Sequence, residues 1–314
     1  MRFKGLGALG LSAIVIGLLP AAALAAKPAA TTGAAANVTF QSARVNGSVD
    51  PNMEATNYYF QYGTTVALGT ETAPTPVGSG PNPVRISVDI GALAPTTRYH
   101  YRIVAVNASG TTLGKRRTFT TRRQPLGVTL AASPNPLKLG SGTTLAGTLS
   151  GTGSAGRKIV LQGNPWPYTQ GFQNASNELL TNATGGFSFS ILSVPFNTQY
   201  RVVMSERPTV VSPIVTVGVK FYVRTRGSKR RVRRGRTVRF SGTVRPARPG
   251  AQIAFQKKRN GRWVSINGTI VRSGGKYSKR VKIRRGGSYR VWTGVADAQY
   301  TSNHGRTIRL RSFR

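Results

Sequence analysis

The sequence predicts an all-β protein built of tandem β-sandwiches. Gly and Pro are frequent and scattered, with 37 and 18 copies in 314 residues, which favours many short strands and turns over helices. Apolar residues recur with the two-residue period of a strand that has one buried face, as in Val238, Phe240 and Val244. A chain of this length fits two or three domains of ordinary size, each with its own core.

The charge is concentrated in the last third of the chain. The whole sequence carries a net charge of +38, and a surface with that much charge attracts anions of almost any kind. Residues 218–314 hold 28 Lys and Arg against one acid, Asp297, which gives +27. Residues 37–123 and 124–217 contribute only +5 and +3. One domain therefore holds most of the charge.

The first residues have the three parts of an export signal. Arg2 and Lys4 precede an apolar run, and Ala23 and Ala25 bracket a small-residue cleavage site. We expect a cleaved signal peptide over residues 1–25. The alternative is a retained membrane anchor, but a span needs roughly 20 mainly apolar residues and this run is interrupted by glycines. Residues 26–37 form an Ala/Thr/Pro-rich leader that we expect to be disordered.

The chain contains no cysteine, which excludes disulfides and thiolate metal sites. An export signal without cysteine is more typical of bacterial than of eukaryotic secretion. We therefore expect a protein that is secreted or associated with the cell surface or cell wall. No later segment is apolar enough to span a membrane, so we expect no transmembrane segment in the mature chain.

The segment 38–122 shows the alternation of a sandwich domain. Tyr58, Phe60 and Tyr62 mark a central strand that follows a turn at residues 50–52. Tyr99 and Tyr101 begin a second strand after the corner at residues 93–95. These patterns predict two strands that share one core.

On residues 45–65 and 93–107, this segment resembles the fibronectin type III modules common in secreted proteins of actinobacteria and their relatives. The resemblance implies a two-sheet sandwich. It also implies a structural role for Tyr99, whose hydroxyl would tie down the corner before it. It says little about a ligand.

Residues 126–217 and 218–314 are predicted to be two related modules. Residues 140–149 align with 235–244, and residues 159–162 align with 253–256. Further along, Gly185-Gly186 aligns with Gly274-Gly275, and residues 200–202 align with 289–291. The third module also contains Asn260-Gly261, a signal for a type I′ hairpin. In this pattern both modules resemble bacterial immunoglobulin-like domains.

The sequence offers no set of residues for catalysis. The whole chain contains only seven acidic residues, and none lies in a motif that pairs two carboxylates. His100 and His304 have no ligand spacing around them, and the serines have no nucleophile-elbow context. We expect a non-catalytic protein without metal or cofactor.

The basic third module predicts electrostatic binding of polyanions, such as anionic cell-wall polymers, acidic polysaccharide or extracellular DNA. Uncompensated charge of this size repels itself and needs counter-ions, so we favour binding over mere solvation of the surface. No groove-reading helix is evident, and we expect no sequence-specific nucleic-acid recognition. We expect the nearby Trp263, Tyr277 and Trp292 to lie mainly in the core. The predicted polyanion-binding residues are Arg230, Arg231, Arg233, Arg234, Arg236, Arg239, Lys257, Lys258, Arg259, Arg262, Lys279, Arg280, Lys282, Arg284 and Arg285.

An aromatic loop in the second module supports an alternative function. Trp166, Tyr168 and Phe172 lie in residues 163–179, where they would be displayed for stacking on sugar rings in a carbohydrate-binding or adhesion protein. The opposing interpretation, to which we give equal weight, is that Trp166 folds back over the end of the sandwich. A further alternative is an accessory subunit of a polysaccharide-degrading system, catalytic only through its partner.

Overall fold

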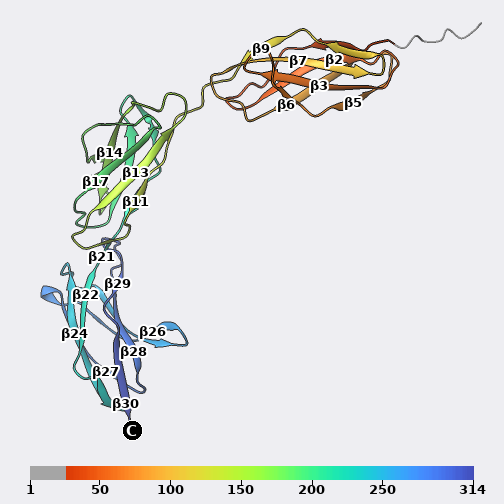
Figure 1. Cartoon of the computed structure of the whole chain (residues 1–314). Helices are drawn as coiled ribbons and strands as arrows, with labels where there is room; N and C mark the ends of the chain where they lie inside the picture. The colour runs from red at the N-terminus through yellow and green to blue at the C-terminus, as the bar shows by residue number, and fades with distance from the viewer. Residues whose placement is uncertain (1–25) are drawn as a thin grey trace, which may run out of the picture. The chain divides into compact units, whose positions relative to one another are not determined.

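The computed structural model describes residues 26–314, so the predicted signal peptide lies outside the described residues. Strands make up the regular structure throughout, as Figure 1 shows. The described residues contain one short 3-10 turn, η1 (Ser273–Gly275), in addition. The predicted all-β class, with tandem sandwiches, is confirmed.

The first module is a sandwich of two antiparallel sheets. One has the order β1-β2-β6, and the other has the order β4-β3-β7-β8, with β5 beside β3 and β9 beside β7. Val45, Phe60 and Tyr101 lie fully buried between them. A three-stranded sheet thus packs on a six-stranded sheet, as in a fibronectin-like sandwich, with the short strands β4 and β5 along β3 and the short strands β8 and β9 along β7. The strands are β1 (Ala29–Thr32), β2 (Ala43–Asp50), β3 (Thr56–Gly63), β4 (Thr70–Glu71), β5 (Thr75–Gly78), β6 (Val84–Ile90), β7 (Arg98–Asn107), β8 (Gly110–Leu113) and β9 (Arg117–Thr120).

Tyr99 ties down the corner before its own strand, as the resemblance implied. The backbone N–H of Ala94 donates to the Tyr99 hydroxyl oxygen at 2.9 Å. The Tyr99 ring stacks on Phe119 with 5.6 Å between ring centroids. The structural role predicted for Tyr99 is confirmed.

The prediction of a disordered leader over residues 26–37 is wrong. Residues 29–32 form strand β1, which pairs antiparallel with β2. The side chain of Thr32 is buried, and the Tyr101 hydroxyl donates to the Gly33 carbonyl at 2.7 Å. The Ala/Thr/Pro-rich composition did not indicate this strand. An edge strand is held mainly by backbone hydrogen bonds to an existing sheet, so it needs few large apolar residues of its own.

The second module packs a sheet of β11, β13 and β17, extended by β10, against a sheet built around β14 and β18. Leu145, Leu149, Ile159 and Leu161 form the centre of its core. The strands are β10 (Gly127–Val128), β11 (Ala131–Ser133), β12 (Leu137–Lys138), β13 (Thr143–Ser150), β14 (Lys158–Pro165), β15 (Gln173–Asn174), β16 (Leu179–Leu180), β17 (Gly186–Ile191), β18 (Thr198–Met204), β19 (Arg207–Val211) and β20 (Val215–Val217).

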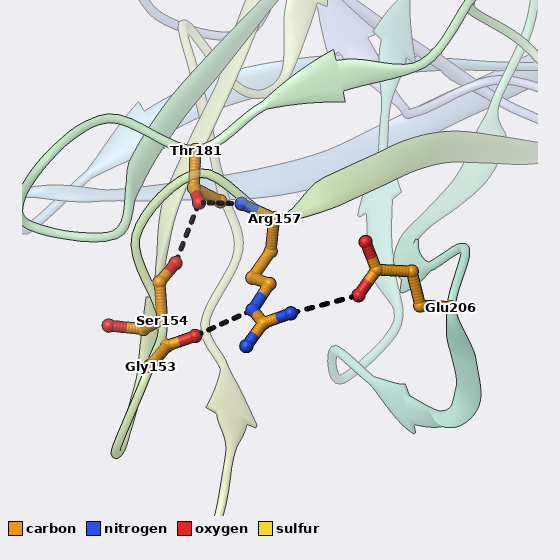
Figure 2. Close-up of polar contacts among 5 residues, drawn as sticks. All are labelled: Gly153, Ser154, Arg157, Thr181 and Glu206. Atoms are coloured by element: carbon orange, nitrogen blue, oxygen red, sulfur yellow. Dashed lines mark hydrogen bonds and ion pairs between the residues drawn. The ribbon is translucent and has the colours of Figure 1, made fainter.

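Arg157 fastens one loop of the second module (Figure 2). Its Nε donates to the Gly153 carbonyl at 2.7 Å, and its Nη1 pairs with the Glu206 carboxylate at 3.1 Å. The Arg157 backbone N–H donates to the Thr181 hydroxyl, which in turn donates to the Ser154 carbonyl at 2.6 Å. The Arg157 side chain thus links the loop at Gly153 to the turn between β18 and β19, where Glu206 lies, and the Arg157 backbone links the same loop to Thr181.

The third module has the same plan. A sheet of β22-β24-β27 faces a sheet of order β23-β30-β28-β25-β26 (Figure 1). Phe240, Phe255 and Tyr277 lie in its core. The predicted hairpin at Asn260 and Gly261 is confirmed, since both residues have the positive φ of a type I′ turn. The strands are β21 (Val219–Lys220), β22 (Tyr222–Gly227), β23 (Arg231–Arg233), β24 (Thr237–Arg245), β25 (Gln252–Arg259), β26 (Arg262–Ile270), β27 (Lys276–Lys282), β28 (Gly287–Gly294), β29 (Asn303–His304) and β30 (Ile308–Phe313).

The structure confirms that the second and third modules repeat one frame. Gly147 faces Phe187 across β13 and β17, as Gly242 faces Tyr277 across β24 and β27. One detail of the predicted alignment is wrong: Gly185 corresponds to Gly275 and not to Gly274. Gly185 and Gly275 each lie directly against the carbonyl of the last aligned strand residue, Leu149 or Val244.

Three hydrophobic cores match the three predicted modules, but the second and third modules belong to one compact unit, residues 125–314. Tyr300 packs against both of their cores. Strand β12 of the second module pairs in parallel with β21, and this pairing joins the two modules.

Candidate polyanion-binding surface

The predicted cations lie on both outer faces of the third module. Arg239 and Arg280 stand opposite each other on the outer face of β24 and β27. Lys258 lies on β25 of the other sheet, and Arg231 lies on β23 at its edge. The fifteen residues therefore do not share one face. Candidate binding sites lie where cations from neighbouring strands come together.

Carboxylates of the protein neutralise few of the cations in the third module, in contrast to the second module. In the second module Arg157 pairs with Glu206 (Figure 2) and Lys158 pairs with Glu178. In the third module, over the residues that the structure describes, only Arg248 has a carboxylate partner, which is Asp297. The other cations of that module depend on ions from outside the chain.

Cations converge around a trough on the outer face of the β22-β24-β27 sheet. Along β24 the side chains of Val238, Phe240 and Val244 are buried, so Ser241 and Thr243 point outward. Because these residues on the middle strand are small while the flanking strands carry long cations, the face is hollow. We define the trough by its floor and walls. The floor is Ser241, Thr243 and Ser278, and the walls are Arg224, Arg226, Arg272 and Lys276, around a volume of about 610 Å³.

None of the four wall cations was among the predicted site residues. Arg224 and Arg226 alternate with the buried Val223, and this alternation was the available signal. The predicted site began at Arg230, where the dense run of arginines starts, and so excluded β22. Clustering along the sequence proved a poor guide to clustering in space.

The third module has two further cationic grooves, one of which adjoins the trough. A groove of about 800 Å³ is lined by Arg226, which it shares with the trough, and by Arg230, Lys258, Arg306 and Arg309. A smaller groove, of about 360 Å³, contains four predicted residues, Lys257, Arg259, Lys282 and Arg284. Burial, reinforced by Arg259 and Arg285, lowers the pKa of Lys257. Such crowding of like charges favours an anionic ligand or counter-ions.

The aromatic residues of this module divide between core and surface. Tyr277 is in the core, as expected, and is 2% exposed. Trp263 and Trp292 are only half-buried. The guanidinium of Arg290 lies over the Trp263 ring, 4.4 Å from its centroid, and Trp263 lines the larger groove. Trp263 is thus the aromatic side chain that contacts this groove, with Arg290 covering one face of its ring.

The alternative glycan site has a different environment. The indole N–H of Trp166 donates to the Asp297 carbonyl at 2.7 Å, and Arg248 lies over its ring at 5.7 Å. Phe172 stacks with the guanidinium of Arg201 at 4.2 Å. Asp297 and Arg248 both belong to the third module, so Trp166 lies where the second and third modules meet. The alternative in which it folds back over the end of its own sandwich stays a prediction. Glycan stacking by Trp166, Tyr168 and Phe172 stays a prediction.

Over residues 26–314, no group of three or more His, Asp or Glu side chains is placed to hold a metal ion. His100 is half-buried on β7, and His304 lies exposed on the short strand β29. The same residues include no helix long and apolar enough to cross a membrane.

No family model and no curated protein matches the chain. Solved structures with weak similarity include a sensor domain of the anti-sigma factor RsgI4 of Pseudobacteroides cellulosolvens, at 20% identity over 31% of this chain and 96% of that one, with a TM-score of 0.26. The FN1–FN3 domains of chicken CNTN1 are 15% identical over 90% and 98%, with a TM-score of 0.29. A tetra-tandem repeat from the extending region of a large adhesion protein is 14% identical over 90% and 74%, with a TM-score of 0.30. At such TM-scores the class of the protein rests on its own sheets, which define a tandem β-sandwich protein.

Proposed function

We propose that this is a non-catalytic, exported protein of the bacterial surface or cell wall, held to extracellular polyanions by its third module. The observation that carries the proposal is the charge of residues 218–314. There 28 Lys and Arg face a single acid, Asp297, and that acid is already paired with Arg248. The two preceding modules have little net charge, so attachment belongs to one end of the chain.

The binding free energy in this proposal comes mainly from counter-ion release. When cations of the module neutralise phosphates of a polymer, condensed counter-ions are freed, and log K falls by about 0.7 to 0.9 per neutralised phosphate per decade of salt. Such binding is strong at low salt and selects little among anions. It suits attachment to a polymer that the protein meets at high local concentration.

The test compares two variants of the full chain that lose equal charge. One replaces four exposed third-module cations, Arg231, Arg233, Arg236 and Arg311, by Gln. The other replaces four exposed first-module cations, Arg98, Lys115, Arg122 and Arg123, by Gln. We expect the first variant to elute from a heparin column at clearly lower salt than the second. Equal elution of both variants would show that total charge, and not the third module, governs binding.

A further inference from the structure

The second module provides an internal comparison for the trough, because its β11-β13-β17 sheet occupies the same place in the repeated frame. In the third module Arg224, Thr243 and Lys276 form one row across the strands. The equivalent row in the second module is Thr129, Thr148 and Gly186. In that row the central hydroxyl residue is kept, while a cation replaces a neutral residue at each side.

The next two rows also gain cations, although at different positions. Arg226, Ser241 and Ser278 stand where the second module has Ala131, Ala146 and Ser188. Beyond them the facing pair Arg239 and Arg280 replaces Thr144 and Ser190. The frame folds in the second module without any cation on this face, so the sandwich itself does not require them. Like charges directly opposite each other destabilise a sheet, which points to a ligand that offsets the repulsion.

The floor of the trough offers free hydroxyl groups between the cations. In the part of the chain that the structure describes, the side chains of Ser241, Thr243 and Ser278 make no hydrogen bond to the protein. In the second module, by contrast, the hydroxyls of Thr129 and Thr148 hydrogen-bond each other at 3.0 Å. The trough thus combines guanidinium and ammonium donors at its sides with unpaired hydroxyl donors below, a set suited to phosphate oxygens.

The spacing of the rows fits a phosphodiester chain. Outward residues of one strand, such as Arg224 and Arg226, recur about every 6.7 Å. A polymer with six backbone atoms per repeat spans about the same length as two extended residues, or about 7 Å. Successive phosphates of such a chain would therefore meet successive rows.

The trough has no surface for stacking nucleobases. Tyr277, the aromatic residue in its lining, is 2% exposed, and its hydroxyl is directed to the Arg224 carbonyl under the sheet. Proteins that bind single-stranded nucleic acid without sequence preference usually add exposed aromatic side chains to the cationic groove. The trough has the cations without the aromatics.

Resting on the proposed function, we propose that the trough is a binding site for a phosphodiester polymer without nucleobases, of the polyol phosphate type. Arg224 and Arg226 bind phosphate oxygens from one side and Lys276 from the other. The hydroxyls of Ser241 and Ser278 donate to the same oxygens.

The experiment measures binding of the full chain to two probes with equal numbers of phosphates, poly(glycerol phosphate) and oligo(dT). The trough variant is Arg224→Gln/Lys276→Gln, and the control is Arg231→Gln/Arg311→Gln, which removes two neighbouring exposed cations outside the trough. We expect the wild-type protein to prefer poly(glycerol phosphate). We expect the trough variant to lose at least about tenfold in affinity, the value of one charge-assisted hydrogen bond, and the control to lose clearly less.

A second variant, Ser241→Ala/Ser278→Ala, keeps the charge and the fold. We expect weaker binding of poly(glycerol phosphate) with an unchanged salt slope, because the hydroxyls contribute no counter-ion release. Equal losses in the trough variant and the control would overturn the trough while leaving the proposed function standing. Binding unaffected in both would overturn the proposed function as well. Oligo(dT) binding as tightly as poly(glycerol phosphate) would overturn the assignment of a base-free ligand.

Discussion

The Tyr277 hydroxyl holds together the three strands beneath the trough. It reaches across β24 at Gly242, where a side-chain Cβ would lie only 2.6 Å from it. It donates to the Arg224 carbonyl at 3.0 Å and shares a hydrogen bond with the Thr225 hydroxyl at 2.7 Å. The glycine is required here because the backbone carbonyl of Arg224, on the neighbouring strand, and the Tyr277 ring together occupy the space of a side chain.

Replacing Tyr277 by Phe removes both hydrogen bonds and leaves the ring in place. We expect the full chain to lose about 1 to 2 kcal/mol in its free energy of unfolding, because the Arg224 carbonyl and Thr225 hydroxyl lose their partner. Urea denaturation measures the loss. Tyr222→Phe is the matched control, since Tyr222 is exposed, and an equal loss in both variants would contradict the role of Tyr277.

Because the Tyr277 hydroxyl titrates, we expect its contribution to the free energy of unfolding to depend on pH. Burial raises the pKa of Tyr277 to about 12, while its hydrogen bond with Thr225 opposes that rise. An unfolded tyrosine titrates near pH 10, so the folded state favours the neutral hydroxyl. The stabilisation is complete below about pH 10 and is lost as pH rises towards the folded pKa. We expect the stability advantage of wild type over Tyr277→Phe to shrink from about pH 10 to 12. A constant advantage in urea titrations over that range would contradict the assignment.

At the scale of elements, strand β1 stabilises the first module through Thr32. The Thr32 hydroxyl oxygen accepts from the Ile103 backbone N–H at 3.2 Å, and its carbonyl accepts from Arg117 Nε at 2.9 Å. Thr32→Val keeps the shape but leaves a buried N–H unsatisfied, and we expect a loss of about 1 to 3 kcal/mol. Thermal unfolding provides the measurement. The exposed neighbour Thr31 gives the control Thr31→Val, which should change little.

On the outer face of β24 and β27, two arginine side chains with the same charge lie opposite each other. Arg239 faces Arg280, and replacing this pair by the second-module residues, as Arg239→Thr/Arg280→Ser, should stabilise the chain at low salt by roughly 0.2 to 1 kcal/mol. Adding salt should stabilise wild type more than the variant, because salt screens the charges. Melting temperatures across a salt series measure both effects. A destabilised variant at low salt would mean that the arginine side chains contribute more by packing than they cost by repulsion.

One polar contact recurs across the modules and defines their common frame. Arg201 Nε donates to Gln162 Oε1 at 2.9 Å, and Arg290 Nε donates to Gln256 Oε1 at 2.8 Å. Arg102 and Gln61 make the same contact in the first module at 2.8 Å. The sequence alignment had matched the Gln and Arg positions of the second and third modules, but it did not predict the contact itself and did not include the first module.

At the scale of the whole molecule, Asn197 is the centre of the joint between the second and third modules. Its Nδ2 donates to the Ala298 carbonyl at 2.7 Å, and its Oδ1 accepts from the Val219 backbone N–H at 2.7 Å. Its backbone N–H also donates to the Gln299 carbonyl at 3.0 Å. These contacts explain why residues 125–314 form one compact unit despite two cores.

Asn197→Ala should therefore uncouple the two modules. It leaves the N–H of the buried Val219 without a partner, at a cost of about 1 to 3 kcal/mol. In calorimetry of the full chain we expect the transitions of the second and third modules to separate. Asn177→Ala, an exposed residue away from the joint, should leave the thermogram unchanged. A single unchanged transition in Asn197→Ala would show that the joint depends on β12 and β21 instead.

The amino-acid sequence was sufficient for the properties that depend on neighbours along the chain. The two-residue alternation predicted the strands and their buried faces, the Asn260-Gly261 pair predicted a hairpin, and the count of charges located the basic module. Which cations converge follows from the three-dimensional arrangement of the strands. Arg224 and Lys276 are far apart in sequence, and only the register of β22 and β27 against β24 places both beside Thr243. That register depends on backbone hydrogen bonds between strands and on loop lengths, and alternation within a single strand carries no information about either.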